Sequence, residues 1–149
     1  MTFDGENIWV ANAYENTVTK LRASDGVIVD VIRAGAAPSH LTFDGKNIWV
    51  ADSGDIGSVG KVSKFLARSG AFKGQFTVDD DPTALTSDGS HIWVNCFNHS
   101  TVVELRIKDG SVVGVYQLRK GLYDILFDGT NIWVTNSADN KVTRINPAR

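Results

Sequence analysis

The chain has 149 residues, and its 15 basic and 17 acidic side chains leave a formal net charge of -2. This balance gives no electrostatic reason to expect a nucleic acid or an anionic membrane as a partner. No apolar run approaches the roughly 18 residues that a membrane-spanning helix needs, no signal peptide is expected, and one domain is expected over residues 1–149.

One phrase, Asp-Gly-x-(Asn/His)-Ile-Trp-Val, occurs four times along the chain. Its copies begin at Asp4, Asp44, Asp88 and Asp128. They contain all four tryptophans of the protein, and successive tryptophans are separated by 40, 44 and 40 residues. A fixed period in this range indicates one supersecondary unit that is copied and stacked. The units are expected at about 1–37, 38–81, 82–121 and 122–149.

Each unit is expected to contain four short strands, and the second unit shows them in order. Strands are predicted at 39–43, 47–51, 61–66 and 71–78, where residues are β-branched and aromatic or alternate between apolar and polar. The Asp-Gly pair between the first two strands supplies the positive φ of a tight hairpin turn. The glycines of these turns are Gly5, Gly45, Gly89 and Gly129. Sustained helical periodicity is missing, so the chain is predicted to be all-β.

Four-stranded antiparallel units with a period near 40 and a fixed tryptophan predict a β-propeller of about four blades. A blade has a neighbour on each side, so both faces of its inner strands must be apolar. Ile, Trp and Val therefore stand side by side in the repeated phrase. The tryptophans are predicted to form the core between blades rather than a cage for a ligand. They are Trp9, Trp49, Trp93 and Trp133.

The stretch NIWVANAYENTVTKLRASDGVIVDVIRAG, residues 7–35, resembles the YVTN and NHL type of bacterial β-propeller repeat. That group includes the virginiamycin B lyase-like propellers, and the resemblance extends over essentially the whole chain. It implies a blade, but not an activity, because such repeats serve as scaffolds, ligand platforms and occasional enzymes. The lyases of the group use a His and acidic constellation with a magnesium ion, and no motif places those residues in this chain.

Variable loops are expected on one face of the propeller. The turns between strands one and two repeat, whereas the loops between strands two and three differ. The tryptophan is followed by its turn glycine after 17 residues in units one and three but after 21 in unit two, so an insertion lies within 52–60. Variety on one face of a repeat scaffold indicates a binding face. The candidate binding residues are Tyr14, His40, Asp52, Asp55, Phe97, His99, Tyr123 and Asp124. Ordinary solvated loops remain the alternative.

Catalytic and metal signals are weak. Cys96 is the single cysteine, which excludes an intrachain disulfide, and its spacing to His99 lacks the second ligand pair of a zinc site. We expect Cys96 to be a small buried residue and His91 to be a turn residue, because Asn fills its place in the other units. The run 79–81 lacks the spacing of an EF-hand loop. No catalytic residue, metal or cofactor is therefore predicted.

The register of the repeat leaves the fourth unit without its outer strand. Two arrangements follow from four blades with uncovered apolar flanks. Either the chain is part of a longer propeller, or two copies associate into a ring of eight blades in which blade one of each packs on blade four of the other.

The preferred functional prediction is a non-enzymatic module that binds a protein, peptide or glycan on its variable loops. The alternatives are a metal-dependent lyase or hydrolase with an acidic and His cluster at the channel mouth, and a structural fragment of a longer propeller. The sequence leaves the ligand and the cellular compartment open.

Overall fold

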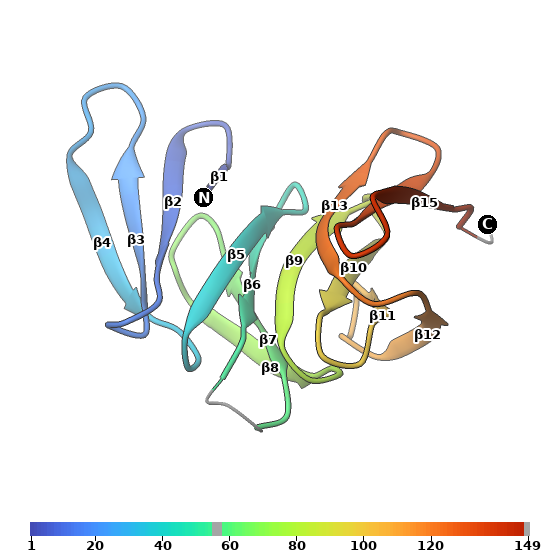
Figure 1. Ribbon diagram of the computed structural model, residues 1–149. Coiled ribbons are helices and arrows are strands. Elements are labelled where there is room, and N and C mark those ends of the chain that lie inside the picture. Colours follow the sequence, from blue (N-terminus) through green and yellow to red (C-terminus); the bar gives the residue numbers. More distant parts are fainter. Residues whose placement is uncertain (55–57, 148–149) are drawn as a thin grey trace.

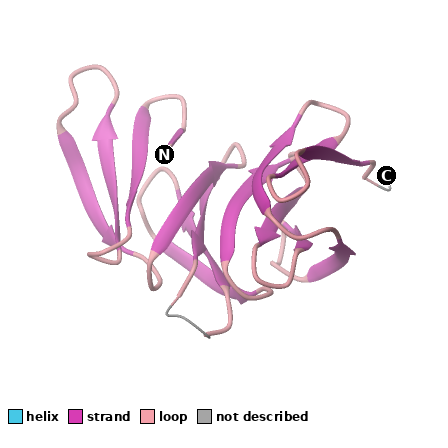
Figure 2. Ribbon diagram, in the orientation of Figure 1, coloured by secondary structure: helices cyan, strands magenta, loops and turns pink. Residues whose placement is uncertain are grey.

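A computed structural model of the protein describes residues 1–54 and 58–147, and every regular element among them is a β-strand (Figure 2). The strands form four antiparallel sheets in which sequential strands are neighbours. The all-β, propeller-type fold predicted from the repeat is confirmed. None of the described residues belongs to a helix that is long and apolar enough to span a lipid bilayer.

Each sheet is one blade. Blade 1 contains β1 (Thr2–Phe3), β2 (Asn7–Asn12), β3 (Thr17–Arg22) and β4 (Ile28–Arg33). Blade 2 contains β5 (Pro38–Phe43), β6 (Asn47–Asp52), β7 (Lys61–Leu66) and β8 (Phe72–Thr77). Blade 3 contains β9 (Pro82–Ser87), β10 (His91–Cys96), β11 (Thr101–Arg106) and β12 (Val112–Gln117). Blade 4 contains β13 (Leu122–Phe127), β14 (Ile132–Asn136) and β15 (Lys141–Ile145), and within the described residues it is three-stranded, as expected.

The blades follow one another along an open arc, with blade 1 and blade 4 at its two ends (Figure 1). The first strand of each blade lies on the inside of this arc, where β5 contacts β9 and β9 contacts β13. Because sequential strands pair outward from there, the last strand of each complete blade lies at the periphery.

The repeated Asp-Gly turn carries a polar clamp for the tryptophan. Gly45 has φ +95°, which a glycine adopts without steric cost. The carboxylate of Asp44 accepts hydrogen bonds from the backbone N–H groups of Lys46 and Asn47 at 2.8 and 2.6 Å and from Nε1 of Trp49 at 2.7 Å. The corresponding bonds recur in the other three blades. The turn thus satisfies the one polar atom that an otherwise apolar side chain carries into the core.

The core lies between the blades. Trp49 and Val62 of blade 2 pack against Ile92 and Val94 of blade 3, and the other two junctions contain the equivalent residues. Trp9, Trp49 and Trp93 are fully buried. Trp133 belongs to blade 4 and is only partly buried, because no blade covers that face. Stacking therefore buries each tryptophan against the blade that follows it.

A charged side chain lies over the tryptophan at each of the first two junctions. Nζ of Lys64 is 4.6 Å from the ring centre of Trp49 and donates a hydrogen bond of 2.6 Å to the carbonyl of Ile107 in blade 3. Lys20 makes the same pair of contacts, with Trp9 and with the carbonyl of Ala67. Each lysine thus combines a cation–π contact with a charge-assisted hydrogen bond between blades.

Candidate functional site

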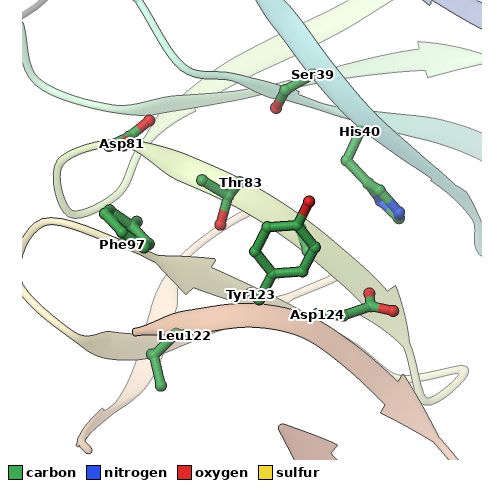
Figure 3. A pocket seen from close by; sticks show the side chains of 9 residues that line it. Ser39, His40, Asp81, Thr83, Phe97, Leu122, Tyr123 and Asp124 are labelled. Atoms are coloured by element: carbon green, nitrogen blue, oxygen red, sulfur yellow. The ribbon is translucent and has the colours of Figure 1, made fainter. Parts of the chain in front are cut away.

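The candidate site is an open pocket of about 560 Å³ on the inside of the arc. Figure 3 shows Asp81 and Phe97 at one end of the pocket, His40 and Asp124 at the other, and Tyr123 between them. Blades 2, 3 and 4 all contribute side chains to it. The complete lining is Ser39, His40, Asp81, Thr83, Ala84, Phe97, Leu122, Tyr123 and Asp124.

Bulges in the inner strands create the pocket. In β13 the pairing moves from Leu122 with Asn136 to Ile125 with Val134, so two residues of β13 oppose one residue of β14. The bulge turns Tyr123 outward, and its side chain is 73% exposed. The strands β5 and β9 have comparable irregularities near their first residues. A bulge redirects side chains away from the regular alternation of a strand, so the same part of three successive blades faces the pocket.

His40 contributes a neutral imidazole. Its Nδ1 accepts a long hydrogen bond of 3.4 Å from the backbone N–H of Leu85, which leaves the proton on Nε2. Burial lowers the pKa of His40 below its usual value, and the positive N-terminus adds to this effect, while the charge of Asp124 opposes it. The ring is therefore a hydrogen-bond donor through Nε2 at neutral pH rather than a cation.

The remaining polar groups make the pocket acidic. Its lining includes the carboxyl groups of Asp81 and Asp124 and no Lys or Arg. Burial raises the pKa of Asp81, as does the neighbouring charge of Asp80. The Asp81 carbonyl accepts a hydrogen bond of 2.9 Å from the backbone N–H of Phe97, which holds that aromatic residue at the rim. The Thr83 hydroxyl is buried and has no hydrogen-bond partner among the described residues.

Four of the eight sequence-predicted binding residues come together in this pocket: His40, Phe97, Tyr123 and Asp124. Tyr14 is 98% exposed in the loop between β2 and β3 and does not line the pocket. Asp55 lies outside the described residues.

Asp52 differs from the expectation of an exposed loop residue. It is the last residue of β6 and only 2% exposed. Its carboxylate accepts hydrogen bonds from the Ser63 hydroxyl and from Nε2 of Gln75, and burial raises its pKa. Both bonds go to one carboxylate oxygen, while the other oxygen is buried and has no hydrogen-bond partner among the described residues. The sequence placed it one residue too far into the loop because strand ends are the least certain part of a pattern.

His99 is exposed and pairs with Asp79, whose other carboxylate oxygen accepts a hydrogen bond from the Thr101 hydroxyl at 2.7 Å. The bond to Asp79 raises the pKa of His99. Burial would raise the pKa of Asp79, but the bonds from His99 and Thr101 outweigh it and lower the pKa. Burial raises the pKa of the neighbouring Cys96 thiol to about 12. Cys96 therefore stays protonated and is not an activated nucleophile.

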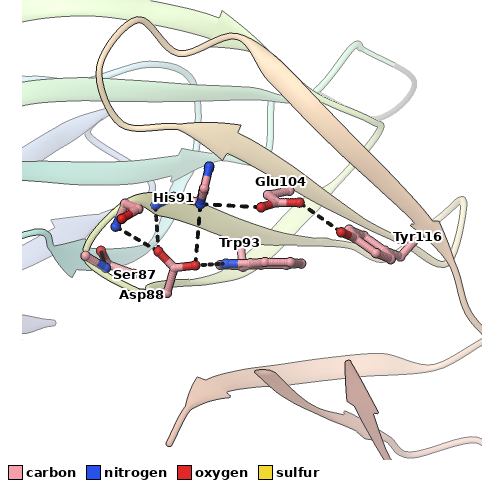
Figure 4. Close-up of polar contacts among 8 residues, drawn as sticks. Ser87, Asp88, His91, Trp93, Glu104 and Tyr116 are labelled. Carbon is pink, nitrogen blue, oxygen red and sulfur yellow. Dashed lines mark hydrogen bonds and ion pairs between the residues drawn. The ribbon is translucent and has the colours of Figure 1, made fainter. Parts of the chain in front are cut away.

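A second polar cluster surrounds Trp93 (Figure 4). Glu104 stands opposite Trp93, where blades 1 and 2 have lysine, and accepts a hydrogen bond of 2.9 Å from the Tyr116 hydroxyl. Nδ1 of His91 lies 3.4 Å from Glu104 and 3.6 Å from Asp88. Burial and the Glu104 carboxylate raise the pKa of Tyr116 to about 12. These groups satisfy one another around the buried indole, and none of them lines the pocket.

No group of three or more His, Cys, Asp and Glu side chains within residues 1–54 and 58–147 is arranged to hold a metal ion. Four of the nine lining residues are among the candidates named from the sequence, and Asp81 and Leu122 are not. Asp81 has φ +55° and occupies the place before the inner strand that Ala37 and Gly121 fill in the neighbouring blades, also at positive φ. A sequence pattern does not reveal this shared backbone conformation, and of the three residues only Asp81 lines the pocket.

Neither a family model nor a curated protein sequence matches the chain. Solved structures match it well. They include the Kuenenia stuttgartiensis hydrazine synthase (TM-score 0.77, 17% identity, 97% of this chain and 48% of that chain). The WD40 β-propeller domain of Doa1 matches with TM-score 0.78, 15% identity and coverages of 99% and 48%. The computationally designed Ika4 protein matches with TM-score 0.81, 12% identity and coverages of 99% and 89%.

These similarities show the fold. The WD40 domain of Doa1 defines the class as a β-propeller. The chain spans about half the length of the hydrazine synthase and Doa1 chains. A four-blade arc with this coverage corresponds to part of a propeller ring.

Proposed function

We propose that the protein is a β-propeller binding module whose pocket between blades 2, 3 and 4 takes a basic side chain from a peptide or protein segment. One observation carries the proposal. The pocket combines two aromatic rings, of Phe97 and Tyr123, with two carboxyl groups, of Asp81 and Asp124, and its lining contains no Lys or Arg.

This combination matches the two parts of a lysine or arginine side chain. Its apolar stem gains from contact with the rings of Tyr123 and Phe97, whereas its charged end is attracted by the carboxylate of Asp124. A cation over an exposed aromatic ring contributes on the order of 0.5–1 kcal/mol. Each contact is weak alone, so a single basic residue should bind weakly and flanking residues should add affinity on the neighbouring loops.

The test uses three capped pentapeptides that differ only in a central Arg, Glu or Ser, titrated against the isotope-labelled protein by NMR. The Arg peptide should bind about fivefold more tightly than the Ser peptide, which corresponds to about 1 kcal/mol, and the Glu peptide should bind least. The affinity of the Arg peptide should fall as salt is added, because the carboxyl groups of the pocket are close to solvent and their attraction is screened.

Tyr123→Ala and Asp124→Asn should each lower the affinity for the Arg peptide about fivefold, as expected for the loss of about 1 kcal/mol of binding free energy. Tyr14→Ala is the control, since this tyrosine is also largely exposed but does not line the pocket. Equal binding of the three peptides, or an equal effect of Tyr14→Ala, would contradict the proposal. Preferential binding of a neutral oligosaccharide would indicate a glycan site instead.

The finer assignment of the repeat to the YVTN and NHL type rests on residues 7–35 and is proposed here on that resemblance alone. The lyase or hydrolase alternative stays a second proposal, and no group of three His, Cys, Asp or Glu side chains among the described residues is arranged to hold its metal ion.

Self-association is the second part of the proposal: two copies of the chain complete one propeller of eight blades. The half-length coverage of the Doa1 propeller domain and the uncovered apolar faces at both ends of the arc support it. In the alternative arrangement, further blades of a longer chain cover the same faces.

A further inference from the structure

We infer that the two end faces of the arc form one interface between copies, in which blade 4 of one copy packs on blade 1 of another through the contacts that join blades 1 and 2 within the chain. This inference rests on the self-association proposed above and names the residues that form the contact between copies. It can fail while self-association holds.

The uncovered face of blade 4 has the residue types with which blades 1, 2 and 3 each pack against the blade that follows. Val142 of β15 is 59% exposed, whereas its counterparts Val18, Val62 and Val102 are at most 1% exposed. Trp133 stands on the same face and is only partly buried. Leu126 is 61% exposed on β13, opposite Trp133. A contiguous apolar face of this kind is unusual on a free surface.

The uncovered face of blade 1 has the residues that receive a tryptophan elsewhere. In blade 2 the receiving residues are Phe43, Ile48, Val50 and Phe65, which pack around Trp9. Blade 1 has Phe3, Ile8, Val10 and Leu21 at the equivalent positions. Ile48 and Val50 are fully buried, while Ile8 and Val10 remain partly exposed and Phe3 is 52% exposed. The two end faces therefore have the same complementary chemistry as an internal pair.

The polar contact of the internal junctions can also form between copies. Lys20 stands opposite Trp9 in the sheet and donates to the carbonyl of Ala67 in the next blade. Arg144 stands opposite Trp133 in the same way and is exposed. Ala23 holds the place of Ala67 in blade 1, since both donate their backbone N–H to the equivalent turn residue. Arg144 of one copy thus reaches the Ala23 carbonyl of the next, over the indole of Trp133.

The curvature of the arc limits the ring to two copies. The chain overlays along 99% of its length on the WD40 propeller domain of Doa1, of which it spans only 48%. Two arcs of that curvature close a ring, with two identical blade 4 to blade 1 contacts related by a two-fold axis. Each contact then buries one Val142 and one Trp133.

Light scattering after size-exclusion chromatography tests the inference on the intact chain. The wild type should have twice the 16.2 kDa chain mass at about 10 μM. Val142→Asp and Arg144→Glu should each give the single-chain mass, because an aspartate in an apolar contact or a reversed charge at the carbonyl prevents closure. Val115→Asp is the matched control: Val115 is 58% exposed on the outer strand β12, away from both end faces, and this variant should remain dimeric.

Mixing distinguishes this arrangement from a symmetric pairing of like faces. Phe3→Asp alters the other end face and should also give the single-chain mass. An equimolar mixture of Phe3→Asp and Val142→Asp retains one unaltered junction and should regain the double mass. Circular dichroism of each variant, with far-UV spectra matching the wild type, identifies the loss of mass as dissociation rather than unfolding.

The outcomes separate the two levels of the proposal. A wild type with the single-chain mass would overturn self-association and the inference together, while the peptide titration would still decide the binding proposal. A dimer that tolerates Val142→Asp and Arg144→Glu, or that tolerates Phe3→Asp alone, would overturn only the pairing of blade 4 with blade 1.

Discussion

The bond between the Asp44 carboxylate and the indole of Trp49 gives the sharpest test of the blade structure. Asp44→Asn keeps the size of the side chain and one acceptor oxygen for the backbone N–H groups of Lys46 and Asn47. The substitution replaces the second oxygen, which accepts a hydrogen bond of 2.7 Å from Nε1 of Trp49, by an NH₂ group. Two donors then face each other beside a ring that is fully buried.

The size of the effect follows from burial. A buried donor without a partner costs about 1–3 kcal/mol, and Trp49 has no access to water in which to replace the lost bond. We therefore expect Asp44→Asn to lower the free energy of unfolding by about 2 kcal/mol. With a urea m-value of about 2 kcal/mol/M, the unfolding midpoint falls by about 1 M.

Asp25→Asn is the matched control. Asp25 also precedes a glycine in a turn and accepts the backbone N–H of Val27 at 3.1 Å, but it is exposed and contacts no indole. Its substitution should change stability by less than about 0.5 kcal/mol. Urea unfolding followed by tryptophan fluorescence, at one protein concentration, measures both variants. Equal midpoints for the two variants would refute the importance of the buried indole bond.

Three further predictions address pH, thiol reactivity and backbone conformation. Backbone hydrogen bonds from Asn131, with the indole bond next, lower the pKa of Asp128 to about 2; because the folded pKa lies below the unfolded value, its contribution is complete above about pH 4 and is lost toward pH 2. The urea midpoint should be lower at pH 3 than at pH 5, and equal midpoints would contradict this. Burial raises the Cys96 thiol pKa to about 12, so Ellman's reagent at pH 8 should label the unfolded chain and leave the native one unlabelled; rapid native labelling would show that the thiol is accessible. Gly110→Ala should destabilise the protein by about 1–3 kcal/mol more than Gly26→Ala, because both glycines have φ +73° but only at Gly110 would the new Cβ overlap the Phe76 ring; equal thermal shifts would contradict the overlap.

Much of the fold could be predicted because its signals are local. The Asp-Gly turn needs only its own residues and glycine at positive φ, as Gly45 shows. The side-by-side Ile, Trp and Val of each phrase indicate a strand that is covered on both faces, and Ile48, Trp49 and Val50 are all fully buried. The bond from Trp49 to Asp44 went unpredicted, although both residues belong to the same repeated phrase.

The candidate site was only half predictable. The repeat register brought His40, Tyr123 and Asp124 to equivalent places, and they do line one pocket. It could not show the bulge in β13 that exposes Tyr123. Nor could it show that Asp52 is buried against Ser63, because that depends on where one strand ends and which neighbour it meets.

By itself, the sequence determined the repeat, the turns and the apolar character of both blade faces, since each depends on residues a few positions apart. The tertiary structure alone decided which face each side chain occupies and what covers it. Trp49 and Trp133 stand in the same phrase, yet one is fully buried and the other partly exposed. The difference arises from stacking: a blade buries its tryptophan only when another blade lies against it, and within the chain that blade is the next repeat unit.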